Sequence, residues 1–65
     1  MIRYRLSGSR GSQELHFSTR FESINEATND LLRYKDIHPD KVDFYEWTIY
    51  KFIDNEMVEQ IKVDI

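Results

Sequence analysis

The sequence predicts an α+β fold (ββαββ) in which one helix packs on one face of a four-stranded, largely antiparallel sheet. Three observations predict it. Apolar residues alternate over two segments near the N-terminus, a helical pattern follows a capping motif at Ser23, and two more strand-like segments, the first of them apolar on both faces, fill residues 42–65. A chain of 65 residues has room for one domain, which we expect to span residues 1–65. The sequence leaves the order of the strands in the sheet open.

The first predicted strand covers residues 2–6, where apolar side chains alternate with Arg3 and Arg5. Successive strand side chains point to opposite faces, so we expect both arginines to lie in water. Residues 7–12 contain two glycines and three serines. This composition predicts a flexible hairpin loop.

The second predicted strand covers residues 14–21 and turns Leu15, Phe17 and Phe21 inward. Pairing Tyr4 with Leu15 or with Phe17 keeps both apolar rows on one face of the sheet. The length of the preceding loop decides between these two registers.

The helix is predicted to begin at Ser23. Its hydroxyl can accept a hydrogen bond from the amide of Glu26, and the Glu26 carboxylate can reach back to the Ser23 amide. Apolar residues then follow at helical spacing: Ile24, Ala27, Leu31 and Tyr34, with Leu32 on the flank. Pro39 restricts the residue before it, so we expect the helix to end near Asp36 and residues 38–41 to form a type I turn.

For the last hairpin, a three-residue loop over residues 54–56 pairs Lys51 with Glu59, the one charged member of each apolar row. The same register pairs Ile53 with Met57, Ile49 with Ile61, Trp47 with Val63 and Tyr45 with Ile65. A two-residue loop would place polar side chains opposite Val63 and Ile65, and it lacks the glycine that tight turns favour. We therefore prefer the three-residue loop, although a slip of one residue would exchange the two faces of the strand.

Residues 42–53 are apolar on both faces of their predicted strand. One row contains Tyr45, Trp47, Ile49 and Ile53, and the other contains Val42, Phe44, Tyr50 and Phe52. A single helix covers one face, with Trp47 in the core beneath it, so the other face is a candidate contact surface for a partner. The predicted interface consists of aromatic, aliphatic and arginine side chains, namely Phe44, Tyr50, Phe52, Val58, Arg3, Arg5 and Arg20.

The chain has a net charge of −3 and no cysteine. Disulfides and thiolate metal sites are therefore excluded, and general binding to a phosphate backbone is disfavoured. Residues 1–35 carry six basic side chains against four acids, whereas residues 36–65 carry three against eight. An acidic half steers a protein toward a basic partner surface. The alternative reading is a solvated acidic edge that keeps a small protein soluble.

No catalytic, cofactor-binding or metal site is expected. His16 lies near Glu14 and Ser18 on an exposed strand face, where such residues are ordinarily solvated, and a chain this short offers little concavity. The alternative partner is a single-stranded nucleic acid, because aromatic side chains beside arginines on a sheet can stack on bases. The negative net charge and the acids Asp43 and Glu46 count against this alternative.

A Phe-x-Ser-x-x-Glu-Ala helix start is followed by a Trp-x-Ile step and a short C-terminal hairpin. These features comprise Phe21, Ser23, Glu26, Ala27, Trp47 and Ile49. In this the chain resembles small orphan proteins of bacteriophages and mobile elements. The resemblance implies an inhibitor of the anti-defence type that binds a host or defence protein, often as a homodimer.

We therefore expect a non-enzymatic protein-binding module without a cofactor, which forms a homodimer and occludes a larger protein that has a basic surface. Self-association would also stabilise a small core that lacks disulfides. No stretch approaches the roughly 20 apolar residues of a membrane span, and the N-terminus shows no signal-peptide pattern. The expected location is the cytoplasm, that of the host if a phage encodes the chain.

Overall fold

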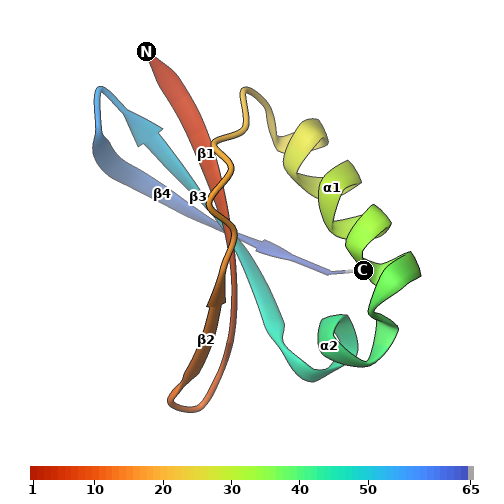
Figure 1. The fold of residues 1–65 in the computed structure, drawn as a ribbon. Coiled ribbons are helices and arrows are strands. Elements are labelled where there is room, and N and C mark those ends of the chain that lie inside the picture. Colours follow the sequence, from red (N-terminus) through yellow and green to blue (C-terminus); the bar gives the residue numbers. More distant parts are fainter. Residues whose placement is uncertain (65) are drawn as a thin grey trace.

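A computed structural model describes residues 1–64 and confirms the predicted α+β fold, with a four-stranded antiparallel sheet and helices on one side of it (Figure 1). The order of the strands is β2-β1-β3-β4, so β1 and β3 are central and β4 lies at an edge. The elements are β1 (Ile2–Arg10), β2 (Gln13–His16), α1 (Ile24–Ile37), α2 (Pro39–Phe44), β3 (Glu46–Ile53) and β4 (Glu56–Val63).

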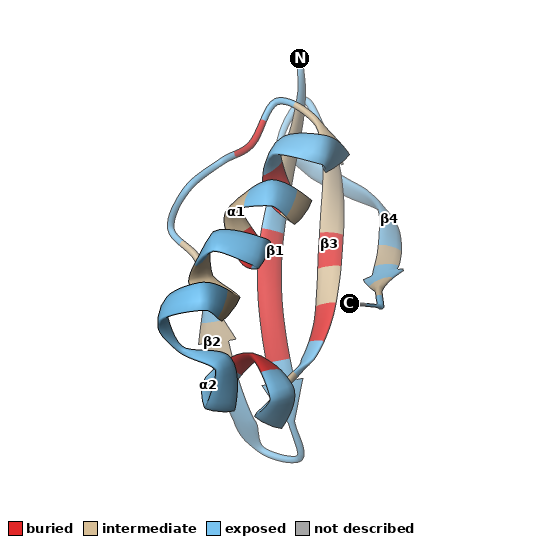
Figure 2. Cartoon of the chain, turned by 90° about the vertical axis from the view of Figure 1, so that its right-hand side faces the viewer, coloured by how far each residue is buried: buried red, intermediate tan, exposed pale blue. Residues whose placement is uncertain are grey.

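The core lies between the helices and the two central strands, where the buried residues gather (Figure 2). Its members are Leu6, Phe21, Ala27, Leu31, Val42, Trp47 and Ile49. Leu6, Leu31 and Ile49 are the largest fully buried side chains. Burial of each such side chain contributes about 1.5–3 kcal/mol, so this small cluster accounts for much of the driving force for folding.

Helix α1 begins at the predicted cap. The Ser23 hydroxyl accepts a hydrogen bond from the Glu26 amide at 3.1 Å. The Glu26 carboxylate accepts from the amide of Glu22, at 2.9 Å, and not from that of Ser23. The helix runs to Ile37, one residue beyond the predicted end near Asp36.

The predicted turn at residues 38–41 and the predicted strand start at Val42 are wrong, because Pro39–Phe44 forms the short helix α2. Proline is favoured in the first helical turn, where its missing amide hydrogen has no role. The helical conformation buries Val42 in the core, and its carbonyl accepts a hydrogen bond from the Trp47 indole nitrogen at 3.0 Å. Periodicity cannot separate a strand from one and a half turns of helix over so few residues.

The first hairpin is also tighter than predicted. Strand β1 continues through the expected loop to Arg10, and the turn consists of residues 11–12 alone. Leu15 therefore pairs with Gly8 and not with Tyr4. Tyr4 instead forms an isolated bridge with Phe21 through two backbone hydrogen bonds of 2.8 Å.

Gly8 is the reason why the sequence pattern predicted a loop where β1 continues. A β-carbon at Gly8 would lie only 2.9 Å from the Trp47 ring, so the indole covers the bare backbone of this strand residue. The glycine therefore marks a close approach of a ring to a strand and not a loop.

The last hairpin combines a correct register with a wrong loop. The pairs Lys51–Glu59, Ile49–Ile61 and Trp47–Val63 are confirmed. The turn, however, has only two residues, Asp54 and Asn55, whose φ angles are 50° and 72°. A bulge restores the register: Lys51 faces Glu59 while Phe52 faces Met57, which leaves Val58 as the extra residue.

Ile53 consequently faces Glu56 and not Met57. Positive φ angles at both turn positions are what a two-residue hairpin turn requires, and Asp and Asn tolerate them without glycine. The predicted pair of Tyr45 with Ile65 lies outside the described residues, and Tyr45 itself precedes β3.

Candidate functional site

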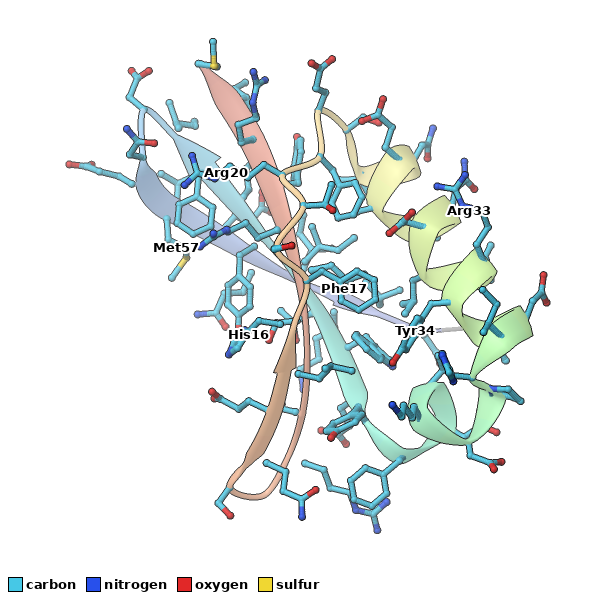
Figure 3. All side chains as sticks on the ribbon, viewed as in Figure 1. His16, Phe17, Arg20, Arg33, Tyr34 and Met57 are labelled. Atoms are coloured by element: carbon cyan, nitrogen blue, oxygen red, sulfur yellow. The ribbon has the colours of Figure 1, made fainter. Side chains whose placement is uncertain are left out.

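Both helices of residues 1–64 lie on one side of the sheet, and we call the opposite side the open face. On this face Arg3 lies beside Phe52, which lies beside Met57 on β4. Figure 3 shows Met57, Arg20 and His16 on the side away from α1, whereas Phe17 and Tyr34 lie between the sheet and α1.

Alternation along β1 and β3 determines what the open face presents. Arg5 faces Tyr50 one row below the Arg3–Phe52 pair, so aromatic and arginine side chains from neighbouring strands lie next to each other. We call Tyr50, Phe52 and Met57 the apolar patch. Met57 is 46 % exposed, and Val58, the bulge residue beside it, is 52 % exposed.

Three arginines line one open depression at the edge of this patch, with a volume of about 380 Å³. We call it the arginine cleft, and its lining consists of Arg3, Arg5, Arg20, Phe52 and Asn55. The ion pairs formed within residues 1–64 are Met1 with Asp54, Glu14 with His16, and Asp30 with Arg33. In the described chain, the three cleft guanidinium groups thus have no carboxylate within 4.0 Å.

A second depression of about 430 Å³ adjoins the arginine cleft and shares Arg5 and Phe52 with it. Tyr50, Met57 and His16 are among its other lining residues. The open face therefore carries two adjoining depressions, one lined by three arginines and the other lined largely by aromatic and apolar side chains.

The structure brings most of the predicted interface together. Tyr50, Phe52 and the predicted arginines line the two adjoining depressions. Phe44 does not belong to this group, because this residue is the last of α2 and lies beside the end of β1. There the Arg10 guanidinium lies 4.6 Å from the Phe44 ring centroid. Met57 was missed because the unpredicted bulge, and not the alternation, sets it beside Phe52.

His16 takes part in a hydrogen-bonded chain that the sequence did not predict in full. Its Nδ1 lies 3.0 Å from the Ser7 hydroxyl, and its Nε2 lies 3.1 Å from the Glu14 carboxylate. Ser7 is only 7 % exposed and lies on the central strand β1. The chain therefore satisfies a buried hydroxyl.

The open face changes sign along its length. At the end opposite the arginine cleft, Ser9 lies between Glu14 and Glu46. The acidic and basic halves of the sequence are consequently not two halves of the molecule, because residues 2–9 of β1, from the first half, pair with β3 from the second.

Neither helix of residues 1–64 is long and apolar enough to cross a membrane. Within the same residues, no three histidine, aspartate or glutamate side chains come close enough to hold a metal ion. No protein-family model, curated protein or solved structure matches the chain.

Proposed function

We propose that the chain is a small, non-enzymatic protein-binding module that covers part of a larger protein with its open face. The observation that carries the proposal is the apolar patch of Tyr50, Phe52 and Met57 on the side of the sheet away from both helices. Clustered apolar surface on a small protein marks an interaction site, and aromatic and arginine side chains are enriched at interface centres.

The proposed mode of action is occlusion. A standard interface buries about 800 Å² on each partner, which is about a sixth of this chain's accessible surface of 4775 Å². A chain of this size therefore offers enough surface to block a functional site. The resemblance to small phage and mobile-element proteins supports an inhibitor of a host or defence protein, acting in the host cytoplasm.

The proposal assigns the open face to a different protein and not to a second copy. A two-fold dimer centred on the apolar patch would bring Arg3, Arg5 and Arg20 of both copies together, and like charges at an interface are costly. The edge strand β4 offers a second seam, but a bulge and the charged side chains Glu59 and Lys62 are features that discourage pairing between sheet edges. We therefore propose a monomer with a free patch in place of the homodimer expected from the sequence.

A single-stranded nucleic acid is the second candidate partner. The observation that favours it is the position beside Phe52 of three arginines that form no ion pair within residues 1–64. Basic grooves with stacking platforms bind such strands without sequence preference. The basic part of the open face, however, ends before Glu14 and Glu46.

The proposal is tested by capturing proteins from the native host with immobilised wild type, Phe52→Asp and Phe44→Asp. Both substitutions place a carboxylate at an aromatic position, but only Phe52 belongs to the apolar patch. We expect a protein that wild type and Phe44→Asp retain and Phe52→Asp loses, with all three variants folded by circular dichroism.

Equal retention by the two variants would overturn the assignment of the open face. Retention of single-stranded DNA or RNA, lost steeply with added salt, in place of a protein would favour the second candidate.

A further inference from the structure

We infer that the arginine cleft binds carboxylate groups on an acidic segment of the target, an inference that rests on the proposed function. Arg3 and Arg5 are two positions apart on β1 and face the same side of the sheet. Arg20 joins them from the segment between β2 and α1 (Figure 3). Three arginine side chains from two separate parts of the chain thus line one hollow, and the Arg3 guanidinium also donates a hydrogen bond of 3.3 Å to the Ile2 carbonyl.

The cleft has the donors that carboxylate recognition needs. Guanidinium groups present planar N–H forks that bind a carboxylate through two parallel hydrogen bonds. Arg3 and Arg5 lie about 6.6 Å apart along the strand, so each can hold a separate carboxylate. The side-chain amide of Asn55 lines the same hollow as a neutral donor.

The chain's own acids leave these donors free. Asp54 and Glu56 flank Asn55 in the sequence. The Asp54 carboxylate is held by the N-terminal amino group of Met1 at 2.5 Å, and within residues 1–64 Glu56 forms no ion pair with a cleft arginine. Among residues 1–64, Asp30 and Glu14 are likewise paired with Arg33 and His16. Three clustered like charges repel one another, and an incoming carboxylate relieves that repulsion.

The extent of the basic zone favours an acidic protein segment over a nucleic acid. A nucleic acid strand carries one phosphate per nucleotide, so its path over the sheet needs cationic groups along its whole course. Here the three arginines occupy one end of the open face, Lys62 lies beside Thr48 one row before Glu46, and Glu14 and Glu46 occupy the other end. A short segment with a few carboxylates and an apolar side chain fits the cleft and the adjoining apolar patch without meeting those acids.

The test is a titration of isotope-labelled protein by NMR, followed at the backbone amides and the arginine Nε groups. The probes are the capped peptide acetyl-Glu-Leu-Glu-Glu-Leu-Glu-amide, the same peptide with glutamine for every glutamate, and hexathymidylate. We expect the glutamate peptide to shift Arg3, Arg5 and Arg20, and the glutamine peptide to bind at least about 10-fold more weakly.

Matched variants separate the cleft from general charge. Arg5→Gln is expected to weaken binding of the glutamate peptide about 3–10-fold, whereas Arg33→Gln, on the outer side of α1 (Figure 3), changes it less than about 2-fold. Arg5→Lys, which keeps the charge and loses the fork, is expected to restore only part of the affinity.

Equal binding of the two peptides, an absence of shifts at the three arginines, or tighter binding of hexathymidylate at these arginines would each overturn the inference. A different result would overturn the proposed function, namely capture of the same proteins by Phe52→Asp and Phe44→Asp. Target capture that needs Phe52 but not Arg5 would leave the protein-binding role intact and remove only the acidic partner.

Discussion

Replacement of Gly8 by alanine tests the packing that connects the helices to the sheet. The new β-carbon would lie 2.9–3.0 Å from three atoms of the Trp47 ring, whereas carbon atoms prefer separations of about 3.5–4.0 Å. The ring cannot move aside cheaply, because Trp47 is 4 % exposed and its indole nitrogen donates to the Val42 carbonyl. The substitution therefore either strains the core or pulls α2 away from β3.

Overpacking of this kind costs about 1–3 kcal/mol, and the lower backbone entropy of alanine offsets about 0.5–1 kcal/mol of that cost. We expect a net loss of about 1–2 kcal/mol for Gly8→Ala. A chain of this length has a total stability of about 3–10 kcal/mol, so the loss is large. For a domain this small it corresponds to a fall in Tm of about 5–15 °C.

The assay is thermal and urea unfolding followed by circular dichroism, with Ser9→Ala as the control. Ser9 is the next residue of β1 and is exposed on the opposite face, so its substitution should change stability by less than about 0.5 kcal/mol. In a Trp47→Leu background, measured with a stabilising osmolyte, Gly8→Ala should become neutral or favourable because the strain is gone. A Gly8→Ala protein as stable as wild type would refute the proposed packing of the indole on β1.

Three further predictions concern Trp47 and the turn between β3 and β4. Trp47→Phe removes the indole hydrogen bond to the buried Val42 carbonyl and should cost about 1–3 kcal/mol in urea unfolding; an unchanged midpoint would contradict this. Asn55→Ala places an ordinary side chain at a φ angle of 72° and should cost about 1 kcal/mol, whereas a stability equal to that of wild type would show that the turn relaxes. The hydrogen bond and charge of the N-terminal ammonium on Met1 lower the pKa of Asp54, so the pair stabilises the fold at pH values above about 4 and loses that contribution as the pH falls through the lowered pKa. Acetylation of the N-terminus should raise the Asp54 pKa in an NMR titration, and an unchanged pKa would contradict the pairing.

The predictions that succeeded depend on local chemistry or on a long pattern. The Ser23 cap needs only four adjacent residues, and the register of β3 with β4 follows from pairing Lys51 with Glu59. The failures depend on tertiary contacts. Gly8 belongs to a strand because the distant Trp47 ring covers it, and residues 39–44 are helical because Val42 and the Trp47 indole meet in the core. The spacing of apolar residues around either segment does not reveal these contacts.

The candidate site shows the same division. Alternation along β1 and β3 predicted Arg3 and Arg5 on the same face as Phe52 and Tyr50, and the strand order, which the sequence left open, sets them in neighbouring pairs. Phe44 is not part of the site, because it belongs to α2. Met57 is part of it, because a bulge whose extra residue compensates for a shorter turn sets Met57 beside Phe52. The turn is one residue shorter than predicted and the bulge adds one residue, so the two errors cancel in the register at Lys51 and the residues before it. They do not cancel at Phe52, because the bulge lies next to this residue.

The most direct test of the open face as the binding surface is site-specific photo-crosslinking in the native host. A benzophenone side chain is placed either at Met57, on the open face, or at Leu32, on the helical side. These residues are matched in exposure at 46 % and 44 %, so neither replacement disturbs the core. We predict a discrete crosslinked protein from position 57 and none from position 32. Crosslinks from position 32 together with none from position 57 would contradict the account.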